Sequence, residues 1–118
     1  MINTLTLLDE VIQNRKNNSD TNDNKSYVGM LYQKGLDAIL KKIAEESGEV
    51  IMASKDTSYT NQNSDKITYE VADLWFHSLI LLHYHGLSSN DILKELQRRE
   101  GKSGITEKLE REQNNELK

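Results

Sequence analysis

The sequence contains no cysteine and no proline. Without cysteine the chain can form neither disulfides nor thiolate zinc sites, and this fits a reducing, cytoplasmic environment. Without proline no helix interior is interrupted by a residue that removes a backbone donor and clashes with the preceding turn. The lack of proline is therefore a weak indication of an all-α fold.

Positive charge and long apolar runs are also scarce. The chain has 15 Lys and Arg against 19 Asp and Glu, a formal net charge of -4. This deficit argues against nucleic acid, which needs a basic surface, but not against a small phosphorylated substrate. The longest apolar runs, such as residues 79–82, are far shorter than the ~20 residues of a membrane span. Residues 1–10 lack the basic start and apolar stretch of a signal peptide. We therefore expect a cytoplasmic protein that binds neither nucleic acid nor membrane.

The spacing of apolar residues predicts one all-α domain over residues 1–118, with a core at about 5–100. No segment alternates at period two for long enough to predict a strand. We expect short helices at 5–15 and 27–34, long helices at about 36–55 and 64–85, and a further helix at about 88–100. Polar loops are expected at 17–25 and 56–63. A turn at 101–104 leads to a charged tail ending at 118, for which we expect a last helix turn or two and frayed ends. The two long helices would lie antiparallel in a small helical bundle.

Residues with strong helix-end preferences define several of these boundaries. Ser26 can cap the second short helix, which Gly35 ends. Ser64 or Asp65 can cap the second long helix, and Gly86 ends it. The next helix opens on Ser88, which forms a capping-box pattern with Asp91.

Two acidic motifs lie on the two long helices. Glu45, Glu46 and Glu49 form an EExxE motif, and Glu70 and Asp73 form an ExxD motif. Residues 50–69 between them are enough to finish one helix, turn, and start back antiparallel. At about 100° per residue, Glu46 borders the apolar stripe of the first helix, Glu49 lies next to it, and Glu45 points furthest out. The hairpin therefore brings the two motifs toward each other.

The second long helix is apolar almost all round between residues 71 and 82, so its carboxylates should be buried. A buried carboxylate that is neither paired, protonated nor metal-bound costs several kcal/mol. One lysine, Lys42, cannot neutralise five carboxylates, whereas a divalent cation can. Carboxylate oxygens suit Mg²⁺, with Mn²⁺ as a second possibility, and Mg²⁺ readily bridges to phosphates. The alternative is that these acids form structural salt bridges in a non-catalytic helical dimerisation module.

Further short motifs accompany the acidic ones in a characteristic order. They are SY at 26–27, KGL at 34–36, KK at 41–42, EESGEV at 45–50, YEVADLWFH at 69–77, GL at 86–87, LQRR at 96–99 and SG at 103–104. The acidic motifs resemble the signature of the all-α nucleoside triphosphate pyrophosphohydrolase superfamily. The complete order resembles the phosphoribosyl-ATP pyrophosphatase family, and the resemblance covers about residues 15–111.

The resemblance implies a reaction and a set of metal ligands. It implies hydrolysis of phosphoribosyl-ATP to phosphoribosyl-AMP and pyrophosphate, the second step of histidine biosynthesis, with Mg²⁺ and in a homodimer that shares its active sites. Together with the helix geometry it indicates Glu46, Glu49, Glu70 and Asp73 as magnesium ligands, and Glu45 as a supporting residue or general base. The alternative enzyme is a relaxed (d)NTP pyrophosphatase of the same superfamily.

Five basic or aromatic side chains are the candidate substrate contacts: Lys34, Lys42, His77, Arg98 and Arg99. Each has a structural alternative. Lys42 could simply pair with Glu46 one turn away. His77 could be a core histidine whose ring nitrogens are satisfied. Arg98 and Arg99 are adjacent and differ by about 100°, so we expect only one to point inward.

Overall fold

The computed structural model describes residues 3–19, 26–60, 64–101 and 104–116, and the side chains of 57–60, 107 and 116 are not described. The helices in these ranges are α1 (Thr4–Asn17), α2 (Tyr27–Lys34), α3 (Leu36–Thr60), α4 (Ser64–Tyr84), α5 (Ser89–Arg99) and α6 (Gly104–Glu116). No strand occurs in the described ranges, which confirms the predicted all-α class. None of the helices described is long and apolar enough to cross a membrane.

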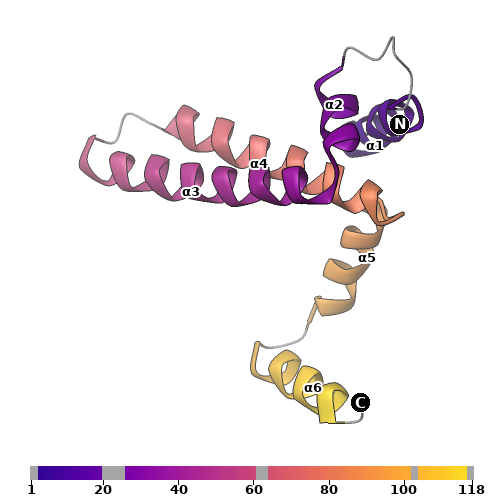
Figure 1. Ribbon diagram of the computed structural model, residues 1–118. Helices are drawn as coiled ribbons and strands as arrows, with labels where there is room; N and C mark the ends of the chain where they lie inside the picture. The colour runs from indigo at the N-terminus through magenta and orange to yellow at the C-terminus, as the bar shows by residue number, and fades with distance from the viewer. Residues whose placement is uncertain (1–2, 20–25, 61–63, 102–103, 117–118) are drawn as a thin grey trace.

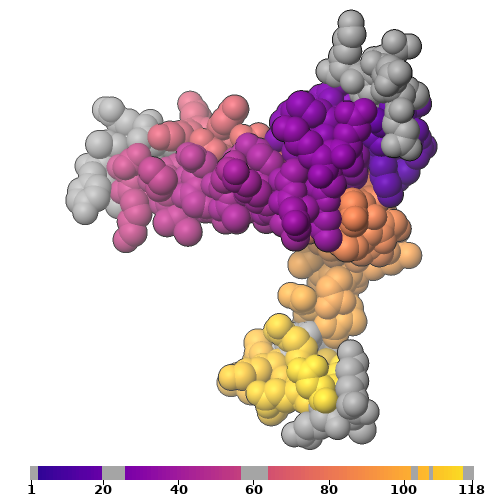
Figure 2. Space-filling model, viewed as in Figure 1, coloured from indigo at the N-terminus to yellow at the C-terminus, as the bar shows by residue number. Residues whose placement is uncertain are grey.

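A long antiparallel hairpin of α3 and α4 is the centre of the fold (Figure 1). α1 and α2 pack at the end of the hairpin where α3 begins and α4 finishes. From this same end α5 and α6 lead away from the hairpin, and Figure 2 shows the yellow α6 standing clear of α3. The predicted pair of long antiparallel helices is confirmed.

The hydrophobic core lies where α1 and α2 meet the hairpin. Its side chains come from all four helices, so the packing fixes the hairpin against the two short helices. The buried members are Ile12, Val28, Leu31, Ile39, Leu79 and Ile80.

The predicted residues at the ends of α2, at the end of α4 and at the start of α5 are found there, whereas Ser64 and Asp65 lie in the first turn of α4. The Ser26 side chain accepts a hydrogen bond from the Gly29 backbone N–H. Gly35 follows α2 at φ 98° and Gly86 follows α4 at φ 75°, conformations that other residues rarely adopt. The carboxylate of Asp91 accepts a hydrogen bond from the backbone N–H of Ser88 at 2.9 Å. This contact caps the start of α5, whose first residue is Ser89.

Two predicted boundaries are wrong. α3 continues to Thr60 through the first part of the expected loop at 56–63, whose residues 61–63 lie outside the described ranges. Residues 56–60 contain no glycine or proline to end a helix, and the Lys66 ammonium lies 3.9 Å from the Asp56 carboxylate across the hairpin. The tail, for which a helix turn or two and frayed ends were expected, forms the 13-residue helix α6, which is rich in strong helix formers and is joined to α5 by an ion pair of Arg98 with Glu110 at 3.6 Å.

Candidate metal centre

The hairpin brings three carboxylates together at one point between α3 and α4. Glu46 of α3 and Glu70 and Asp73 of α4 each offer one oxygen, and these oxygens all lie within 4.8 Å of one another. Glu70 and Asp73 share a face because they are three residues apart on one helix. Glu46 is 7% exposed and Glu70 is 9% exposed. The predicted burial of Glu70 is confirmed, and Glu46 lies at the core as expected, whereas Asp73, which was also expected to be buried, is half-buried.

The electrostatics of this acidic cluster favour the uptake of positive charge. Burial raises the pKa of Glu70, and the nearby charges of Glu49, Glu46 and Asp73 raise it further, while Lys66 lowers it. The Lys42 ammonium lies 3.7 Å from Glu46, but its side chain is partly exposed. One partly solvated lysine leaves a surplus of negative charge on three clustered carboxylates. A divalent cation with a preference for oxygen ligands fits this donor set.

The two other acids of the first motif lie outside the cluster of three. Glu49 is exposed, although its charge is close enough to raise the pKa of Glu70. Glu45 is also exposed and lies 3.3 Å from the Lys42 ammonium. The outward position expected for Glu45 is therefore confirmed, whereas Glu49 is not one of the three residues whose oxygens all lie within 4.8 Å of one another.

His77 is buried beside the acidic cluster with both ring nitrogens in hydrogen bonds. Its Nδ1 lies 2.8 Å from the backbone carbonyl of Asp73, which can only accept, so Nδ1 carries the proton. The other ring nitrogen, Nε2, then accepts a hydrogen bond from the Tyr27 hydroxyl at an O–N distance of 2.7 Å. Burial raises the pKa of Tyr27; Lys42 lowers it, and Glu46 and Asp73 raise it again. Within this chain His77 therefore links α2 to the α4 turn that carries Asp73.

The remaining candidate contacts are spread over two helices. Lys34 is exposed in the last turn of α2. Arg98 binds Glu95 in a forked geometry with N–O distances of 3.0 and 2.8 Å, and Arg99 binds the same carboxylate at 3.2 Å. These hydrogen bonds lower the pKa of Glu95 to about 2. Both arginines lie in the last turn of α5, which leads away from the hairpin (Figure 1).

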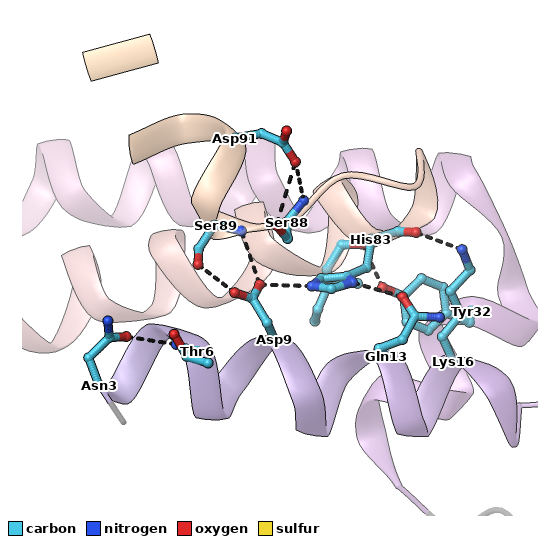
Figure 3. A network of polar contacts seen from close by, with 11 residues as sticks. Asn3, Thr6, Asp9, Gln13, Lys16, Tyr32, His83, Ser88, Ser89 and Asp91 are labelled. Carbon is cyan, nitrogen blue, oxygen red and sulfur yellow. Dashed lines mark hydrogen bonds and ion pairs between the residues drawn. The ribbon is translucent and has the colours of Figure 1, made fainter. Parts of the chain in front are cut away.

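A second polar network was not predicted from the sequence. It joins Asp9 of α1, His83 of α4 and Ser89 at the start of α5 (Figure 3). The partners are far apart in the sequence and no motif connects them, so only the packing of the three helices reveals the contact.

The raised pKa of Glu70 predicts how the stability of the metal-free protein depends on pH. A carboxyl whose folded pKa exceeds its unfolded pKa contributes stability that is present below the unfolded pKa and is lost as pH rises through the folded pKa. We therefore expect Glu70→Gln, which removes this titration, to be more stable than the wild type at pH 7 without divalent cations. The difference should shrink in acid. Urea unfolding of both proteins in the presence of a chelator, at several pH values, measures this difference. Equal stability of the two proteins at pH 7 would contradict the repulsion between Glu70 and the neighbouring acids.

Comparison with known proteins adds an independent line of evidence. The family described as phosphoribosyl-ATP pyrophosphohydrolase matches residues 5–100. A phosphoribosyl-ATP pyrophosphatase of Hydrogenovibrio crunogenus is 56% identical over 107 residues, which cover 91% of this chain and 91% of the relative. A protein of the same name from Ralstonia nicotianae is 48% identical, over 92% of this chain and 90% of the relative. Another, from Neisseria meningitidis serogroup C, is 50% identical, over 91% of this chain and 92% of the relative.

Proposed function

This chain belongs to the phosphoribosyl-ATP pyrophosphohydrolase family, and we propose that it hydrolyses 1-(5-phosphoribosyl)-ATP to 1-(5-phosphoribosyl)-AMP and pyrophosphate. This is the second step of L-histidine biosynthesis, and we place it in the cytoplasm. The observation that carries the proposal is the cluster of Glu46, Glu70 and Asp73 on two facing helices. Relatives that bear the name of this enzyme match about nine-tenths of the chain.

The proposed cofactor is Mg²⁺, with Mn²⁺ as a substitute. Glu46, Glu70 and Asp73 would hold it, because their oxygens are clustered and short of positive charge. Glu49 is the proposed fourth ligand, which requires its exposed side chain to turn toward the cluster. When bound, such a cation neutralises phosphate charge and lowers the pKa of a bound water.

The protein's own side chains then have to accept a proton and hold the phosphates. Glu45 is the proposed general base or supporting residue, because it is a carboxylate at the exposed rim of the cluster. Lys42 and Lys34 are proposed to contact substrate phosphates, and His77 to act by holding α2 beside the site.

Arg98 and Arg99 are proposed substrate contacts that act across a homodimer. The surface supports a dimer because large apolar side chains are exposed on both helices of the hairpin, including Ile51, Tyr69 and Trp75 at 60% or more. A recess of about 450 Å³, lined mostly by apolar side chains of α4 and α5, lies next to Trp75. Exposed apolar surface of this kind favours association. Sedimentation equilibrium should give twice the 13.6 kDa mass of one chain, and a single-chain mass would contradict the dimer.

The test of the proposed function is a comparison of substrates. Pyrophosphate release should be measured with phosphoribosyl-ATP, ATP, dUTP and dCTP at saturating Mg²⁺. We expect kcat/KM for phosphoribosyl-ATP to exceed kcat/KM for ATP, dUTP and dCTP by about 10²-fold or more. The free nucleotides lack the phosphoribosyl group, so the polar side chains that bind it would be left unpaired. Higher efficiency with a free nucleotide would indicate the relaxed (d)NTP pyrophosphatase instead. No turnover of any substrate by the folded protein would favour a non-catalytic dimerisation module.

A further inference from the structure

The end of the hairpin carries a buried polar cluster that the proposed reaction does not use. Asp9 of α1 lies between His83 at the end of α4 and Ser89 at the start of α5 (Figure 3). Its Oδ1 accepts from His83 Nε2 at 2.8 Å and from the Ser89 backbone N–H at 3.0 Å, and its Oδ2 accepts from the Ser89 hydroxyl. The exposed fractions of the His83 and Asp9 side chains are 6% and 16%.

The histidine ring of this cluster has a polar partner on each of its two nitrogens. His83 Nδ1 lies 2.9 Å from Gln13 Oε1, and the Gln13 amide is oriented by donating its Nε2 to Asn17 at 2.9 Å. Polar side chains of α1 therefore face both ring nitrogens of His83. Burial by itself would raise the pKa of Asp9, but hydrogen bonds from Ser89 and His83 outweigh it and lower the pKa.

Within one chain, this cluster holds the start of α5 against α1. Ser89 is the buried residue among those described in α5, whereas the apolar side chains of Ile92, Leu93 and Leu96 are each at least 40% exposed. Asp9 thus binds α5 at the point where it leaves the body of the protein. Lys16 of α1 adds a bond at the end of α4, donating to the His83 carbonyl at 2.6 Å. A buried polar pair adds little net stability compared with apolar packing, but its directional bonds define one orientation of the helix that it holds.

We propose that Asp9 is a positioning residue that fixes the direction of α5, and with it the placement of Arg98 and Arg99. It acts through Ser89 and does not touch the substrate. The part of this inference that concerns the arginines rests on the proposed function. The part that concerns the attachment of α5 does not depend on it.

The test combines hydrogen exchange with kinetics on three variants of the full chain. Asp9→Asn removes the charge at nearly constant shape, and Ser89→Ala removes one bond but keeps the contact between Asp9 and His83. Glu10→Gln is the matched control, because Glu10 is the exposed neighbour of Asp9 on α1. For Asp9→Asn we expect amide exchange in α5 to be about tenfold faster, while exchange in α3 and α4 stays as in the wild type. Ser89→Ala should show a smaller effect in the same helix, and Glu10→Gln none.

The kinetic expectation separates positioning from general destabilisation. Contacts that bind substrate and transition state equally affect KM and leave kcat unchanged. Asp9→Asn should therefore raise KM for phosphoribosyl-ATP by about tenfold and change kcat by less than about twofold.

Each result decides a part of the proposal. Unchanged exchange in α5 of Asp9→Asn overturns it, and so does faster exchange with an unchanged KM. If Asp9→Asn speeds amide exchange in all helices, the Ser89→Ala variant decides instead. Unchanged exchange in its α5, or faster exchange there with an unchanged KM, then overturns the proposal. If the wild type releases no pyrophosphate, the proposed function fails, and the exchange measurement alone still supports or overturns the attachment of α5.

Discussion

Replacing Glu70 with glutamine is expected to lower the rate of pyrophosphate release from phosphoribosyl-ATP by about 10³-fold, on the scale of losing a preorganised electrostatic group in an active site. Glu70 offers one of the three clustered oxygens, so its loss leaves two carboxylates in the cluster. Its side chain is only 9% exposed, so we expect that water from the solvent does not take the place of the lost carboxylate. Glutamine keeps the shape of the side chain but removes the charge that we propose holds a divalent cation. The measurement is kcat at saturating substrate and Mg²⁺.

Asp65→Asn is the matched control for this substitution. Asp65 is an exposed carboxylate in the first turn of the same helix, and we expect its variant to keep the wild-type rate within about twofold because exposed charges contribute little. Unfolding cannot explain the loss in Glu70→Gln, since that variant is expected to be more stable than the metal-free wild type. If the variant kept a tenth or more of the wild-type kcat, Glu70 would not be a ligand of the catalytic cation.

Removing divalent cations is expected to abolish the activity, again by about 10³-fold or more. A cation that neutralises phosphate charge supplies several kcal/mol of transition-state stabilisation, and each 1.4 kcal/mol corresponds to about a factor of ten in rate. Activity in excess EDTA should be at background and should return when Mg²⁺ or Mn²⁺ is added. Undiminished turnover in EDTA would contradict a metal-dependent reaction.

A binding readout complements the chelation experiment and does not require turnover. A ligand that binds only the folded state raises its melting temperature. We expect millimolar Mg²⁺ to raise the Tm of the wild type and to leave the Tm of Glu70→Gln unchanged. An equal shift in both proteins would place the bound cation elsewhere.

The parts of the fold that follow from local chemistry could be predicted from the sequence. Helix ends at Ser26, Gly35 and Gly86 were correct because capping and positive φ depend on a few neighbouring residues. The burial of Glu46 was correct because helical periodicity places it beside the apolar stripe. The extension of α3 through residues 56–60 was missed, because polar composition indicates a loop while the absence of a helix-ending residue permits a helix.

Contacts between distant segments could not be predicted in the same way. The periodicity of α4 indicated burial on all sides, yet Trp75 is 60% exposed in the single chain, since periodicity does not tell which chain covers a face. The partners of the His83 ring, Asp9 and Gln13, lie on α1, and no spacing rule connects residues that far apart. Likewise, the positions of Arg98 and Arg99 relative to the acidic cluster depend on the direction of α5 and on the proposed partner chain.

The most direct test of the central claim, that the cluster of Glu46, Glu70 and Asp73 holds the catalytic cation, is anomalous diffraction from crystals grown with Mn²⁺. The account predicts a manganese peak bound by these three carboxylates in the wild type and no peak there in Glu70→Gln. A wild-type crystal in which the three carboxylates are instead neutralised by lysine or arginine side chains, with manganese absent from the cluster, would contradict it.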